Sequence, residues 1–197
     1  MSSAIGVKMP PETSAVHYTI DPASSRFTVR AFAAGLLAGL GHNPVIAIRD
    51  FSGEVNFTPD DLTKSSVGIT IQAGSFEVQN DVSEKDLHEI TRTMNDQVLE
   101  VKRFPEIAFE SRQVSGMKLG ESLYVVKVEG DLFLHGVTRP QTLSANVAPA
   151  DDKLRVYGEF SIKQSDFKLK LVSVAGGALK LKDELKLSFD IIAKKDS

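Results

Sequence analysis

The 197-residue chain contains no cysteine. Disulfides, thiolate metal sites and thiol nucleophiles are therefore excluded, and the fold must be stabilised by packing. Long apolar runs are also missing. The longest, from Ala31 to Leu40, is rich in glycine and alanine and far shorter than the roughly 20 residues that cross a bilayer. We therefore expect no transmembrane segment.

An excess of basic residues is absent as well. The formal net charge is −3 and the isoelectric point is near 5.8. Proteins that bind nucleic acid usually concentrate positive charge on one face, so we expect no nucleic-acid partner. Hydrophobic residues make up 42% and charged residues 25% of the chain, close to the average for globular proteins, which indicates a sizeable buried core.

The N-terminus has neither the basic start nor the apolar centre of a secretory signal peptide. Residues 1–16 are predicted to form a flexible tail, and residues 17–195 a single domain, because no linker interrupts them. The expected location is the cytoplasm for the chain as given, or the periplasm if the N-terminus has been trimmed.

The segment from Ser122 to Leu143 alternates apolar and polar residues almost without a break. A period of two is typical of a half-buried antiparallel strand. Its apolar face carries Tyr124, Val126, Val128, Leu132 and Leu134. The opposite face ends in His135, which we expect to be exposed to solvent.

The same alternation recurs along the chain, and it predicts an all-β, antiparallel, up-and-down barrel of about eight strands. Between Val45 and Phe57 the apolar positions change parity, which predicts a bulge near Arg49 and Asp50. A helical pattern between Asp81 and Leu99 predicts one short helix across one end of the barrel. Ser83, three residues before Asp86, has the position of its capping residue.

A barrel of this size either fills with its own side chains or holds one small ligand, and the sequence leaves both possibilities open. The inner face is dominated by Phe, Val, Ile and Leu, with Gly53 and Gly158 predicted to leave room for an apolar molecule. The predicted apolar lining, assigned by strand parity, consists of Phe27, Val29, Phe51, Val55, Phe57, Ile69, Ile71, Phe109, Val126, Val128, Leu132, Leu143, Val156, Phe160, Leu187 and Phe189.

Three stretches of the sequence resemble the YceI-like family: FPEIAFES from Phe104, EGDLFLHGVTRPQTL from Glu129, and the run from Ser161 to Ile191. The resemblance implies a lipocalin-like barrel that binds polyisoprenoid or other long-chain lipids, and a possible homodimer. One departure is Lys168, which stands where the family commonly has glycine after an Asp-Phe pair.

Histidines are the side chains best suited to proton transfer near neutral pH. His42 lies in a glycine-flanked turn that can point it into the barrel mouth, and His88 on the predicted helix can join it there, so both are candidate ligand-binding residues. No nucleophile elbow or catalytic triad is present, and no short spacing of ligands predicts a metal site. We therefore expect neither a metal nor a cofactor.

The favoured hypothesis is a non-enzymatic carrier that sequesters a long-chain amphiphilic lipid, of polyisoprenoid or fatty-acyl type, in the barrel. Transfer of each methylene out of water would contribute about 0.8 kcal/mol. Two alternatives remain: a small-molecule enzyme that uses His42 and His88, and a filled barrel that acts as an interaction module.

Overall fold

The computed structural model describes residues 14–34, 43–174 and 179–196. Most of the predicted tail lies outside these ranges, and its last residue, Val16, already begins a strand. His42 also lies outside the described residues.

The strands form a closed antiparallel barrel of eight strand positions, as predicted. Three of these positions are each occupied by two shorter strands in succession: β1 (Val16–Ile20) with β2 (Arg26–Ala34), β3 (Val45–Ile48) with β4 (Phe51–Phe57), and β5 (Ser66–Gln72) with β6 (Phe76–Val78). The other five are β7 (Glu106–Lys118), β8 (Tyr124–Leu134), β9 (Val137–Pro149), β10 (Lys153–Lys163) and β12 (Leu179–Lys195). A two-residue strand, β11 (Ser173–Val174), pairs with β12.

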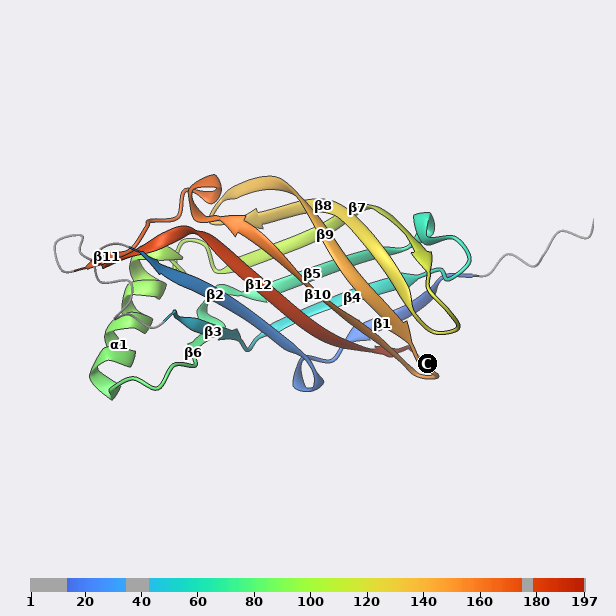
Figure 1. Cartoon of the computed structure of the whole chain (residues 1–197), viewed down its shortest axis with the longest axis horizontal. Helices are drawn as coiled ribbons and strands as arrows, with labels where there is room; N and C mark the ends of the chain where they lie inside the picture. The colour runs from blue at the N-terminus through green and yellow to red at the C-terminus, as the bar shows by residue number, and fades with distance from the viewer. Residues whose placement is uncertain (1–13, 35–42, 175–178, 197) are drawn as a thin grey trace, which may run out of the picture.

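Neighbouring positions follow the order of the chain, which is the up-and-down topology (Figure 1). Both β1 and β2 pair with β12, so the first and last strand positions close the ring. Closing the ring removes the two end strands that an open sheet would present to another chain.

The predicted bulge at Arg49 and Asp50 is instead a break between two strands. On one side of the break β3 pairs with β2 and β6, while on the other side β4 pairs with β1 and β5. The break itself is held by hydrogen bonds: the Arg49 N–H donates to the Ser75 carbonyl over 3.2 Å, and the Gln72 N–H donates to the Asp50 carbonyl over 2.9 Å. The change in parity therefore marks a bend shared by neighbouring strand positions.

The alternation along β8 is confirmed, with Tyr124, Val126, Val128, Leu132 and Leu134 all buried. The prediction for His135 is wrong, because only 10% of its side chain is exposed. Strand parity ends at Leu134, and His135 enters the β8–β9 turn with a φ of 52°. There its Nε2 lies 2.7 Å from the Glu100 carboxylate, and its ring packs 4.3 Å from that of Phe104 between centroids.

The predicted helix is present as α1 (Glu84–Thr93), with the Asp86 N–H donating to the Ser83 hydroxyl as expected. A π-helical turn from Met94 to Val98 follows it. Figure 1 places α1 at one end of the barrel. Met94 and Val98 are buried, but Leu87 and Ile90 on α1 are each 37% exposed. The π-helical turn therefore packs against the core, while α1 projects from it.

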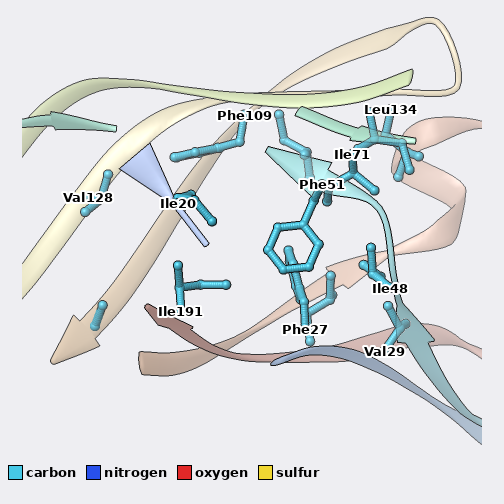
Figure 2. Packing of buried hydrophobic residues seen from close by; sticks show 14 of the residues in the cluster. Ile20, Phe27, Val29, Ile48, Phe51, Ile71, Phe109, Val128, Leu134 and Ile191 are labelled. Atoms are coloured by element: carbon cyan, nitrogen blue, oxygen red, sulfur yellow. The ribbon is translucent and has the colours of Figure 1, made fainter. Parts of the chain in front are cut away.

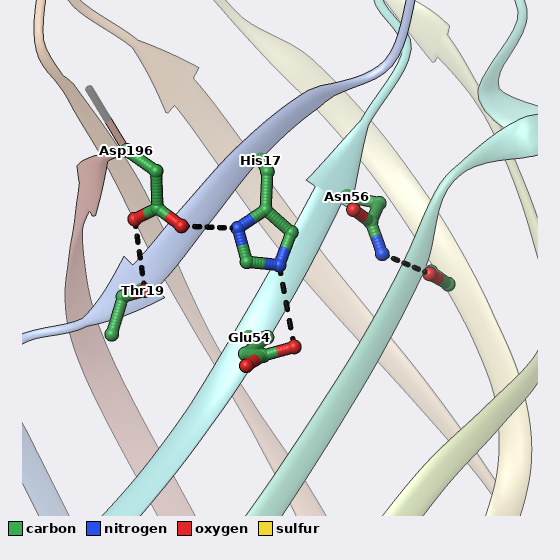
Figure 3. A network of polar contacts seen from close by, with 6 residues as sticks. His17, Thr19, Glu54, Asn56 and Asp196 are labelled. Atoms are coloured by element: carbon green, nitrogen blue, oxygen red, sulfur yellow. Dashed lines mark hydrogen bonds and ion pairs between the residues drawn. The ribbon is translucent and has the colours of Figure 1, made fainter.

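A polar cluster joins the two strands that close the ring (Figure 3). His17 on β1 places Nδ1 2.5 Å from an Asp196 carboxylate oxygen and Nε2 3.3 Å from a Glu54 carboxylate oxygen on β4. The Thr19 hydroxyl donates to the other Asp196 oxygen over 2.9 Å. The hydrogen bond to Asp196, followed by that to Glu54, raises the pKa of His17 above 6.5.

We expect this cluster to make stability depend on pH. Because the folded-state pKa of His17 is raised, its contribution is fully present below the unfolded value of 6.5 and is lost as pH rises through the folded value. The melting temperature should therefore fall more between pH 6 and pH 8 for the wild type than for His17→Gln, at constant ionic strength. His88→Gln, at an exposed position on α1, is the control; an equal fall in all three proteins would contradict the prediction.

Candidate functional site

The barrel encloses an apolar cavity of about 180 Å³. Its lining extends from Leu62, in the 3-10 turn between β4 and β5, to Leu99 and Leu169 near the helix end. The polar side chains in the lining are Ser65, Ser66 and Gln141. Figure 2 shows part of this interior, with side chains from several strands directed toward one another. Such a cavity suits a hydrocarbon group and offers few hydrogen bonds.

All but one of the predicted apolar residues line this cavity. They are Phe27, Val29, Val55, Phe57, Ile69, Ile71, Phe109, Val126, Val128, Leu132, Leu143, Val156, Phe160, Leu187 and Phe189. Phe51 is buried but does not contact the cavity; its ring packs edge-on against Phe27 with centroids 6.2 Å apart. It directly follows the break at Arg49 and Asp50 and packs in the core there.

Several lining residues remain only partly buried although they lie on the inner face. Val55, Ile69, Leu143, Val156 and Phe160 are half-buried, and each lines the cavity. In a filled barrel these side chains would contact one another and be fully buried. The interior therefore retains unfilled apolar surface, which favours the hollow alternative over the filled one.

The inner-face glycines do not create this space, contrary to the prediction. A Cβ atom on Gly158 would lie 2.5 Å from the Ser144 carbonyl oxygen and 2.9 Å from the Phe189 ring. A Cβ atom on Gly53 would lie 2.2 Å from the Gly68 carbonyl oxygen. The protein's own backbone and side chains occupy the room above both glycines.

Residues from irregular segments close the helix end of the cavity, and strand parity could not identify them. Leu99 follows the π-helical turn, and Leu169 follows the 3-10 turn η5 (Gln164–Phe167). Both are buried and line the cavity. The Lys170 ammonium donates to the Gln97 side-chain carbonyl over 2.9 Å and ties the two segments together.

The histidine pair predicted at the mouth is not assembled by the described part of the chain. His88 is exposed on α1 and does not line the cavity, and His42 lies outside the described residues. Within the described ranges, no group of three or more His, Asp or Glu side chains is placed to hold a metal ion.

The sequence profile of the YceI-like domain matches residues 18–193. The chain belongs to the YceI-like family. A UPF0312 protein of Vibrio campbellii is 24% identical over 179 residues, which cover 86% of each chain. A UPF0312 protein of Pseudomonas putida is 30% identical over 135 residues, covering 68% of this chain and 63% of the relative.

Solved structures show the same fold. A polyisoprenoid-binding domain from Saccharophagus degradans matches with a TM-score of 0.68 and 17% identity, over 92% of this chain and 99% of that one. BcnA from Burkholderia cenocepacia matches with a TM-score of 0.67 and 20% identity, over 88% of this chain and 98% of that one. The closed barrel is therefore the YceI-like fold.

Lys168 shows what the departure from the family pattern means structurally. It ends η5 in a left-handed conformation, with a φ of 58°. Glycine adopts this conformation without steric cost, whereas a lysine there carries some backbone strain. Among the described residues, no helix has the length and apolar character needed to span a bilayer.

Proposed function

We propose that this YceI-like protein is a non-enzymatic carrier that holds the hydrocarbon chain of an amphiphilic lipid inside its barrel. The observation that carries the proposal is the enclosed cavity with an almost wholly apolar lining. The match to a polyisoprenoid-binding domain supports an isoprenoid chain as the ligand class.

The physical basis is desolvation of the chain. Each methylene moved from water into an apolar site contributes about 0.8 kcal/mol, so ten would contribute about 8 kcal/mol before the cost of ordering the ligand. Hydrogen bonds are not needed for such affinity, which fits the few polar side chains in the lining. Among the described residues, the lining includes no histidine or carboxylate that could transfer a proton to a bound molecule.

Native mass spectrometry of the gently purified protein, followed by organic extraction, tests this function. We expect a discrete added mass that is released by solvent and proves to be a long-chain lipid. The same spectrum reports whether the protein is a monomer or the homodimer that the family resemblance suggested. A ligand-free protein that also takes up neither added farnesol nor palmitic acid would contradict the carrier function.

A further inference from the structure

The barrel wall is open between β9 and β10 near the helix end. These strands pair only from Leu154 opposite Pro149 to Glu159 opposite Ser144. Beyond that point, residues 137–143 of β9 pair with β8 alone, and residues 160–163 of β10 pair with β12 alone. Pro140 lies in this unpaired part of β9, where a residue without an N–H is tolerated because the strand has a free edge.

Two polar side chains lie on the inward face of β9 at this opening. Arg139 stands opposite the buried Leu132, and Gln141 stands opposite the buried Gly130. The next inward positions of β9, Leu143, Ala145 and Val147, are apolar and line the cavity. An arginine on the inner face of an apolar barrel would be costly if it were enclosed. Here it is exposed, because the missing strand pairing leaves a groove.

This groove is directly adjacent to the lipid cavity. It is lined by residues of β9, β10 and η5, and by Glu184 of β12. Gln141 and Ile162 belong to the lining of both the groove and the cavity. A molecule whose chain lies in the cavity can therefore place its polar end in the groove by passing these two side chains.

The groove carries two cations, Arg139 and Lys163, and two carboxylates, Asp166 and Glu184, and Arg139 is the cation that is free to meet an anion. Its Nε donates to the main-chain carbonyl of Asp166 over 3.2 Å, which fixes the guanidinium and leaves its two terminal nitrogens without a partner among the described residues. Lys163 and Glu184 are opposite each other in the β10–β12 register, so their charges offset one another. The Asp166 carboxylate is the group that opposes an anion.

We propose that the opening between β9 and β10 is the head-group site of the lipid, and that Arg139 there binds a phosphate group whose hydrocarbon chain occupies the cavity. The proposal rests on the carrier function and adds the chemical class of the head group. Arginine suits this role because its terminal nitrogens can donate two parallel hydrogen bonds to phosphate oxygens.

Titration calorimetry with farnesyl monophosphate and farnesol tests the proposal, since the two probes share one chain and differ in the head group. We expect the wild type to bind farnesyl monophosphate about tenfold more tightly, which corresponds to one charge-assisted hydrogen-bonded contact. Arg139→Gln should remove this preference and leave farnesol binding unchanged. Asp166→Asn should increase the affinity for the phosphate. Arg155→Gln, at an exposed arginine elsewhere on β10, is the matched control.

Equal binding of both probes by the wild type, or an unchanged preference in Arg139→Gln, would overturn the head-group site while leaving the carrier function intact. Failure of the wild type to bind either probe would overturn the carrier function itself, and the head-group site with it. Melting temperatures equal to that of the wild type verify that each variant is folded.

Discussion

Replacement of Val128 by tryptophan is expected to abolish retention of the lipid while the barrel still folds. Val128 is 7% exposed and lines the cavity from β8. An indole at this position would occupy space that the hydrocarbon chain needs. Loss of even three buried methylenes would weaken binding by about 2.4 kcal/mol, which is more than tenfold. Native mass spectrometry of the variant should show the protein without its added mass.

Val125→Trp is the matched control, because Val125 lies on the outer face of the same strand and is 37% exposed. The chain contains no tryptophan, so in each variant the tryptophan fluorescence comes from the introduced side chain alone and reports whether that side chain is buried. We expect a blue-shifted emission for Val128→Trp and a red-shifted emission for Val125→Trp. Retention of lipid by a folded Val128→Trp protein with a buried indole would place the ligand elsewhere.

Replacement of Gly158 by alanine is expected to destabilise the barrel by about 1–3 kcal/mol, the usual cost of forcing extra volume into a packed interior. The added methyl group would collide with the Ser144 carbonyl oxygen, at 2.5 Å, and with the Phe189 ring. Relief of this clash requires the Phe189 ring or the backbone of β9 to shift. Chemical denaturation, with the free energy of unfolding extrapolated to water, measures the effect.

Gly74→Ala provides the comparison, since a Cβ atom there would have no atom within 4 Å. We expect this variant to be neutral or slightly more stable, because alanine restricts the unfolded chain more than glycine does. A Gly158→Ala protein as stable as Gly74→Ala would show that β9 yields to the methyl group at little cost.

The sequence predicts the barrel and most of its lining because alternation along a strand directly assigns each side chain to a face. It predicts a bulge at Arg49 and Asp50 where the structure has a break between two strands. The sequence of one strand does not show which other strands pair with it. Leu99 and Leu169 were missed for a related reason: they come from irregular segments, in which no period assigns a face.

The two polar residues at the opening can be recognised in the sequence, but their role can be interpreted only with the structure. Arg139 and Gln141 interrupt the apolar face of β9, and parity alone would place both inside the barrel. Only the separation of β9 from β10 shows that this part of the inner face reaches solvent. His135 had no such signal, since its burial depends on a left-handed turn and on contacts with Glu100 and Phe104.

The pairing of β1 and β2 with β12 also determines when the protein can finish folding during its synthesis. Residues 18–20 pair with residues 193–195, so the first strand has no partner on that side until residues 193–195 have left the ribosome. Contacts between such distant segments slow folding, and an unpaired strand edge can join other chains while it waits. A nascent chain of this protein therefore exposes the unpaired edge of β1 until the end of β12 has left the ribosome.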